Sequence, residues 1–276
     1  MLAQLSPVAF RLFGIAVYWY AVIIVSGIII AVWLSSREAV RVGMKSDDVV
    51  DFMIWGLPSA IIAARLYYVI FEWQDYVNNP IDIFLIRNGG LAVYGGLIGG
   101  GIALILFARH HFISTWTFLD IAAPTVILAQ GIGRWGNFMN HEAYGPDTTK
   151  AFLEGLHLPN FIIENMNIDG IYRQPTFLYE SLWSFLGFIV LILLRRKKNF
   201  LKQGEVFLLY VIWYSFGRFF IEGLRTDSLY VFGLIRVSQL LSLILFVGGI
   251  ALMVIRRRNP KLAYYDRSQG DSEKIL

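Results

Sequence analysis

Arginine, amide and acidic side chains recur at helical spacing inside two apolar stretches of this sequence. Gln130, Arg134 and Asn137 stand at positions i, i+4 and i+7, so a helix would carry all three on one face. A second stretch repeats this arrangement at positions i, i+4, i+8 and i+11. It contains Tyr214, Arg218, Glu222 and Arg225.

These residue types favour the binding of phosphate. The guanidinium of arginine is a permanent cation, and its planar fork donates two parallel hydrogen bonds to phosphate oxygens. We therefore expect Arg134 and Arg218 to bind a phospholipid head group whose acyl chains remain in the bilayer. The alternative is that Arg134–Glu142 and Arg218–Glu222 are ion pairs that only hold the helices together. We favour the binding site because the cations of the whole set outnumber what internal pairing requires.

The composition places these residues in a membrane. Of 276 residues, 57% are hydrophobic and 16% are charged, which excludes a water-soluble globule, a disordered chain and a coiled coil. A helix needs about 20 apolar residues to cross a bilayer. We predict an all-α polytopic membrane protein with seven transmembrane helices. The predicted spans are residues 15–34, 50–71, 91–108, 118–138, 176–194, 205–222 and 234–255.

Basic residues in alternate connections predict the orientation. They follow the first, third, fifth and seventh spans, for example at Arg37, Arg109, residues 195–198 and residues 256–258. Because basic loops stay in the cytoplasm, we expect the N-terminus outside and the C-terminus inside. Both polar faces then lie toward the outer side.

The same topology gives the domain organisation. Residues 1–262 form one seven-helix transmembrane domain, and residues 263–276 form a polar cytoplasmic tail. Residues 139–175 form a long outer loop between helices four and five, and such a long loop is commonly a functional lid or disordered.

A glycine-rich segment begins the third predicted span. Residues 89–101 contain seven glycines, with Tyr94 among them. One interpretation is close packing of helices through small residues. The other is a loop whose backbone N–H groups approach an anion. The two interpretations are compatible.

One segment resembles a family signature. Residues 133–145 read GRWGNFMNHEAYG, and this resembles the signature G-R-x-G-N-F-x-N-x-E, followed shortly by glycine, of bacterial prolipoprotein diacylglyceryl transferases. The resemblance extends over about residues 10–255. The other matching segments, in the same order as in the family, are Tyr18-Trp19-Tyr20, Ala64-Arg65-Leu66, Gly89-Gly90 through Gly95-Gly96, Gln174 to Glu180, and Arg218 to Arg225.

The resemblance implies an enzyme of the bacterial cytoplasmic membrane whose active site faces the outer leaflet. Such an enzyme transfers the diacylglyceryl group of phosphatidylglycerol to the lipobox cysteine thiol of a prolipoprotein, and glycerol phosphate leaves. The implied partners are phosphatidylglycerol, the prolipoprotein signal peptide and membrane lipids, but no nucleic acid, and no metal or organic cofactor is implied. The chain has no cysteine, which fits a thiol supplied by the substrate.

Matching positions imply roles for individual residues. Arg134 and Arg218 would stabilise the phosphate, and Asn137 and Asn140 would hydrogen-bond the glycerol hydroxyls or orient Arg134. Tyr20 would position the lipid head group. Further substrate-binding positions are Arg65 and Gly145, and positions that support the arginines are Glu142, Glu222 and Arg225.

The base that deprotonates the thiol is left open. Many family members carry histidine where this chain has Tyr94, and a tyrosine phenol, which titrates at about 10, is a poor base at neutral pH. Tyr94 acts either as a tyrosinate beside arginines or only as a hydrogen-bonding group that orients the lipid, and we favour the second role. His141 is another candidate base.

A function of another class is also compatible with the polar residues. Arginines within the membrane and broken, glycine-rich helices suit a secondary transporter or channel for an anionic solute. We see no inverted repeat in the sequence, and seven spans do not divide into equal halves. The transferase is therefore the favoured interpretation.

Overall fold

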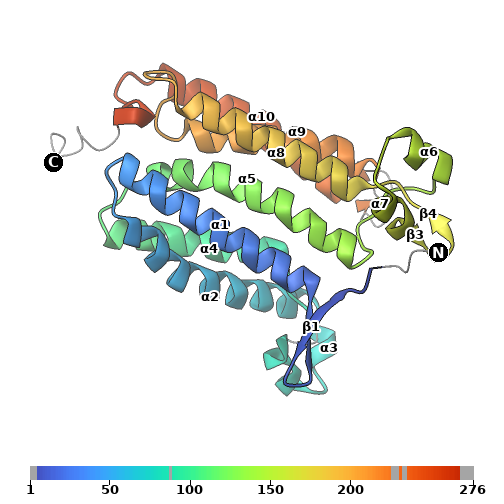
Figure 1. The fold of residues 1–276 in the computed structure, drawn as a ribbon. Helices are drawn as coiled ribbons and strands as arrows, with labels where there is room; N and C mark the ends of the chain where they lie inside the picture. Colours follow the sequence, from blue (N-terminus) through green and yellow to red (C-terminus); the bar gives the residue numbers. More distant parts are fainter. Residues whose placement is uncertain (1–4, 87–88, 225–229, 232–234, 268–276) are drawn as a thin grey trace. The chain divides into compact units, whose positions relative to one another are not determined.

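The computed structural model describes residues 5–86, 89–224, 230–231 and 235–267 (Figure 1). Within this part of the chain, seven helices have 18 residues or more and correspond to the seven predicted spans. They are α1 (Trp19–Arg41), α2 (Ser46–Phe71), α4 (Val93–His110), α5 (Thr115–Met139), α8 (Thr176–Arg195), α9 (Glu205–Glu222) and α10 (Val237–Arg258).

Six of these helices are long and apolar enough to cross a membrane. The remaining one, α9, has 18 residues and carries Glu205, Arg218 and Glu222. Charged side chains inside spans usually face a partner or a cavity, because they are costly to expose to lipid. The protein is thus mostly helical with six candidate membrane spans, and the charged helix α9 contributes to the candidate site.

The first predicted span begins later than expected, because residues 15–18 form a strand. The strand β2 (Ile15–Tyr18) pairs antiparallel with β1 (Val8–Leu12). Phe13 and Gly14 form the turn, with φ of 49° and 82°. Apolar character alone does not distinguish a strand from a helix, and here the backbone of residues 15–18 is paired with β1 before α1 starts.

The chain divides into two compact units, residues 35–118 and residues 1–34 with 119–276, which we describe separately. In the unit of residues 35–118, α2 and α4 pack through small residues. A Cβ atom on Gly95 or Gly99 would overlap Ala63 of α2, so the helices approach more closely than larger residues allow. This confirms the packing interpretation for these two glycines. The short elements α3 (Trp73–Tyr76) and η1 (Pro80–Phe84) lie between α2 and α4 in sequence.

In the other unit, two tryptophans join α8 to α9. The Nε1–H of Trp183 donates to the carbonyl oxygen of Trp213, and the Nε1–H of Trp213 donates to that of Trp183, both at 3.1 Å. The two rings stack with centroids 4.4 Å apart. Gly187 and Gly217 provide the space, because a Cβ atom on either would overlap the indole of the opposite helix. This pair, which we call the tryptophan lock, fixes the register of α8 against α9. In Figure 1 these helices and α10 run side by side.

A buried acid caps the start of α9. Asp120 of α5 is fully buried, and its carboxylate accepts backbone N–H groups from Gly204 at 2.5 Å and Phe207 at 2.9 Å. The first N–H groups of a helix have no carbonyl partner within the helix, and here the Asp120 carboxylate accepts hydrogen bonds at this end in place of such partners. Glu205 pairs with Arg257 of α10 at 2.6 Å. These contacts hold one end of α9 against α5 and α10.

The first residues of the expected C-terminal tail are packed. Tyr265, in η3 (Tyr265–Arg267), is 1% exposed, and its backbone N–H donates to Leu201. Gln203 also bonds to Ala263 through the backbone. The rest of the expected tail, residues 268–276, lies outside the described residues.

The segment β5 (Tyr230–Val231) pairs with β6 (Ile235–Arg236) before α10.

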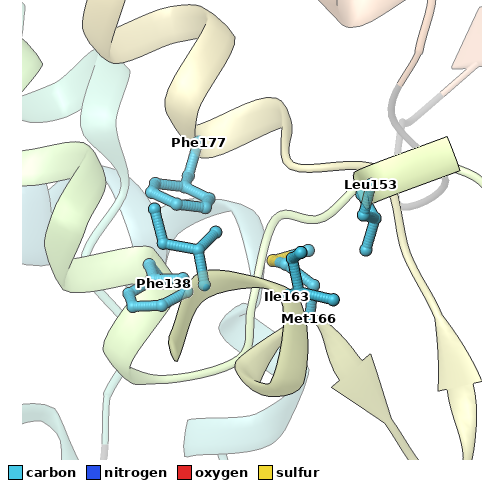
Figure 2. Close-up of a cluster of buried hydrophobic side chains, with 6 residues drawn as sticks. Phe138, Leu153, Ile163, Met166 and Phe177 are labelled. Carbon is cyan, nitrogen blue, oxygen red and sulfur yellow. The ribbon is translucent and has the colours of Figure 1, made fainter. Parts of the chain in front are cut away.

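Residues 139–175 contain secondary structure and form part of a small apolar core. The elements are α6 (Lys150–Gly155), α7 (Asn160–Asn165) and the antiparallel pair β3 (Asn167–Ile168) and β4 (Ile171–Tyr172). A hydrogen bond from Lys150 to Glu164, at 3.0 Å, raises the pKa of the Lys150 ammonium. Figure 2 shows buried side chains of this segment meeting Phe138 of α5 and Phe177 of α8. The core consists of Phe138, Leu153, Ile162, Ile163, Met166 and Phe177.

Candidate functional site

Two arginines from different helices meet on one carboxylate. The Nε of Arg134, on α5, lies 2.8 Å from Oε2 of Glu180, on α8. The Nη1 of Arg218, on α9, lies 3.2 Å from Oε1 of the same glutamate. Glu180 is largely buried, with 8% of its side chain exposed, while both arginines remain partly accessible. The predicted convergence of Arg134 and Arg218 is therefore present in the structure.

A second acid supports Arg218. Glu222 lies one turn further along α9, and its Oε2 is 2.5 Å from Nη2 of Arg218. The carbonyl oxygen of Glu222 accepts a hydrogen bond from Arg236, the last residue of β6. The ion pair between Arg218 and Glu222 that the spacing predicts is thus formed, but Arg218 also binds Glu180. Arg225, the fourth residue of the predicted face, lies outside the described residues.

An amide links Arg134 to Glu142. The Nη1 of Arg134 donates to Oδ1 of Asn137 at 3.2 Å, and Nδ2 of Asn137 donates to Oε1 of Glu142 at 2.9 Å. Arg134 pairs with Glu180, so this indirect link stands in place of the Arg134–Glu142 ion pair of the alternative interpretation. The hydrogen bond between Asn137 and Arg134 is the contact required if Asn137 orients Arg134, which is one of the two roles predicted for it.

The turn after α5 is held by the segment that begins α8. His141 and Ala143 have positive φ values of 54° and 57°, which non-glycine residues seldom adopt. The hydroxyl of Thr176 donates to the carbonyl oxygen of Ala143 at 2.7 Å. Gly145 bonds to Gln174 through the backbone, and a Cβ atom on it would lie 2.9 Å from Gln174 and Thr176. Glycine at 145 thus allows the two segments to approach.

Tyr20 lies at the same end of α5, and Asn140 follows the end of that helix. The ring of Tyr20 packs against α5, where a Cβ atom on Gly136 would be 2.9 Å from its Cδ2. The side chain of Asn140 is exposed. One of the two compact units contains the arginine pair together with Asn137, Glu142 and Tyr20.

His141 contacts a buried asparagine. Its Nε2 is 3.1 Å from Oδ1 of Asn165. The Nδ2 of Asn165 donates to the carbonyl oxygen of Phe138, so its Oδ1 must be the acceptor and Nε2 of His141 the donor. In this tautomer Nδ1 is the ring nitrogen that can accept a proton.

Arg65 and Tyr94 belong to the other unit and are described within it. Arg65 is buried, and its guanidinium donates to the backbone carbonyls of Asp82, Ile83, Gly89 and Gly90, at 2.6 to 2.9 Å. It therefore holds the segment that precedes α4. Tyr94 is the second residue of α4, and 39% of it is exposed.

Glu180 is the central residue that the sequence analysis did not place at the site. Glu180 is unusual because it is a charged residue near the end of an apolar span. It also falls within a segment that matches the family. Its contacts with Arg134 and Arg218 are between helices, and spacing within one helix cannot reveal them. An acidic residue in another span, at the same predicted membrane depth as Arg134 and Arg218, is the signal that could have identified Glu180 as their partner.

Comparisons with known proteins show the family of the chain. The family model described as prolipoprotein diacylglyceryl transferase matches residues 7–255. The chain is 75% identical to a phosphatidylglycerol–prolipoprotein diacylglyceryl transferase of Enterococcus faecalis, over 98% of this chain and 97% of the relative. It is 58% identical to the protein of the same name from Lactiplantibacillus plantarum, over 100% and 98% of the two chains. A Listeria welshimeri relative, also of that name, is 56% identical over 95% and 93%. The chain therefore belongs to the prolipoprotein diacylglyceryl transferase family.

Proposed function

We propose that this transferase moves the diacylglyceryl group of phosphatidylglycerol onto the lipobox cysteine thiol of a prolipoprotein. The observation that carries the proposal is the meeting of Arg134 and Arg218 on Glu180, in a chain of this family. The substrates are those in the names of the relatives. Family membership also favours group transfer over the transport of an anionic solute, since the relatives are named transferases.

The reaction sets three requirements. The cysteine sulfur attacks a glyceryl carbon, a C–S bond forms, and the C–O bond to phosphate breaks so that glycerol phosphate leaves. The thiol must lose its proton because the thiolate is the nucleophile. Sulfur, carbon and leaving oxygen must be in line, and the negative charge that grows on phosphate must be stabilised. Arg134 and Arg218 supply this stabilisation.

Other residues of the chain take the supporting roles. Asn137 orients Arg134, and Glu142 holds Asn137. Asn140, Tyr20 and Gly145 bind the lipid head group and its glycerol, as the family match implies. Arg65 fixes the segment before α4, and Tyr94 orients the lipid through its hydroxyl. The residue that accepts the thiol proton is unassigned, and Nδ1 of His141 is a candidate.

We propose a multi-pass location in the bacterial cytoplasmic membrane with the site toward the outer leaflet. All seven long helices would span, including α9, with the N-terminus outside and the C-terminus in the cytoplasm. The basic residues in the last turns of α1, α4, α8 and α10 support this orientation.

A transfer assay tests the proposed function. The purified protein is incubated in detergent with phosphatidylglycerol and a synthetic lipobox peptide, and the peptide is analysed by mass spectrometry. We expect a mass increase of one diacylglyceryl group and release of glycerol phosphate. A peptide with serine in place of cysteine is the control and should remain unmodified. An unmodified cysteine peptide, together with uptake of an anionic solute by proteoliposomes, would support the transporter instead.

A further inference from the structure

Glu180 occupies the position between the two arginines that are proposed to bind phosphate. Its Oε2 accepts from Nε of Arg134 at 2.8 Å, and Nη1 of Arg218 donates to Oε1 at 3.2 Å and to Oε2 at 3.4 Å. We propose that Glu180 is a positioning residue, which fixes both arginines before the lipid arrives and opposes the lipid phosphate electrostatically. This inference rests on the proposed function.

The backbone that carries Glu180 is tied to both helices that supply the arginines. The next residue, Ser181, donates to the carbonyl oxygen of Gly131 on α5 at 3.0 Å and accepts from Nε1 of Trp135 on α5 at 3.1 Å. The tryptophan lock ties α8 to α9 one turn further along. Glu180 therefore lies where α5, α8 and α9 are fixed to one another, which suits a residue that sets the separation of two side chains.

The charges of the four described groups that pair here are balanced. Arg134 and Arg218 carry two positive charges, and their described ion-pair partners Glu180 and Glu222 carry two negative charges. A phosphodiester anion therefore meets no surplus of positive charge from these four groups. Glu180 therefore has two opposing effects on the reaction. Its charge weakens the binding of the lipid, and its hydrogen bonds hold the arginines in the orientation that catalysis needs.

Two substitutions separate these effects. In Glu180→Gln the negative charge is lost, and one of the two acceptor oxygens becomes an NH2 group that donates instead of accepting, so a hydrogen bond to the arginines is lost. We expect the KM for phosphatidylglycerol to fall several-fold and kcat to fall about 10²-fold, the cost typical of a catalytic group displaced by about 1 Å. In Glu180→Asp the charge remains but the side chain is one methylene shorter. Here we expect an unchanged KM and a kcat reduced about tenfold, by the same geometric argument.

A second readout uses the product. Glycerol phosphate should inhibit the Glu180→Gln enzyme at lower concentration than the wild type, because Glu222 alone then balances the two arginines and one positive charge is in surplus. Glu154→Gln is the matched control, since Glu154 is an exposed glutamate of α6 whose side chain, within the described part of the chain, makes only a long ion pair with Lys150, at 3.9 Å. This variant should leave KM, kcat and inhibition unchanged.

The outcomes distinguish the possible roles. Thermal unfolding in detergent shows whether each variant is folded, and a merely structural role predicts a lower melting temperature with unchanged KM and kcat in the folded fraction. That result would overturn the proposal, as would a Glu180→Gln enzyme whose KM rises. If Glu180→Gln does not fold, a normal kcat in folded Glu180→Asp overturns it instead. A wild-type enzyme that transfers no lipid refutes the proposed function itself, before any variant is compared.

Discussion

The two guanidinium groups at Glu180 retain donors for a ligand. A guanidinium has five N–H donors, and within the described residues Arg134 uses only Nε and Nη1, and Arg218 only Nη1 and Nη2. The expectation that cations outnumber their internal partners is not met by this pair, because two acids balance it. Phosphate recognition then depends on the placement of donors rather than on surplus charge.

Removal of either arginine should affect the rate strongly. We expect Arg134→Ala and Arg218→Ala each to lower kcat by about 10²–10³-fold, because each removes a donor to the charge that grows on phosphate. Lysine at either position should restore only part of the rate, since it keeps the charge but lacks the fork. The transfer assay with phosphatidylglycerol and a lipobox peptide measures this, and full activity of Arg134→Ala would show that it stabilises no charge.

The phenol of Tyr94 gives a separate test at the scale of one residue. If its hydroxyl only orients the lipid, Tyr94→Phe should retain a rate within about tenfold of wild type, the cost of one neutral hydrogen bond. The pH dependence of kcat should be unchanged. A large loss of rate together with a shifted pH profile would instead assign proton transfer to Tyr94.

At the scale of elements, the sequence predicted most helices closely. The span predicted at 205–222 coincides with α9, and the one predicted at 176–194 ends one residue before the end of α8. These limits follow from apolar runs bounded by charged or glycine residues. The strand at 15–18 was not predicted, because β2 is as apolar as a helix start and its pairing with β1 depends on a turn at Phe13 and Gly14.

The tryptophan lock should contribute to stability through two hydrogen bonds. Trp213→Phe keeps a ring but removes the Nε1–H that bonds to Trp183, which should lower the free energy of unfolding by about 1–2 kcal/mol. Gly217→Ala should cost more, because its Cβ would overlap the Trp183 indole and force α8 and α9 apart. Thermal unfolding in detergent provides the comparison. Gly155→Ala, where a Cβ atom meets nothing within 4 Å, is the control.

At the scale of the whole molecule, the sequence predicted a helical membrane protein and the convergence of Arg134 and Arg218. It did not predict the structure of residues 139–175, where Leu153, Ile163 and Met166 are buried. Short apolar stretches separated by turns carry little periodicity, so their common core becomes visible only with the fold. Glu180 was missed for a related reason, since contacts between helices leave no spacing in the sequence.

The absence of cysteine makes the orientation directly testable. Single cysteines introduced at His157, before α7, and at Lys198, after α8, should react differently with a membrane-impermeant maleimide added to intact cells. We expect labelling at 157 and protection at 198 until the membrane is permeabilised. The unsubstituted chain offers no thiol and is the control. The reverse pattern would contradict the orientation inferred from the basic loops.

The stacking of Trp183 on Trp213 has an optical consequence. Two indoles with centroids 4.4 Å apart couple electronically, so their paired transitions should give a near-ultraviolet circular dichroism couplet. The difference spectrum between wild type and Trp213→Phe would isolate that couplet from the other tryptophans. Because the signal depends on the sliding of one helix along the other, it would report, without any attached label, whether substrate entry shifts α8 along α9.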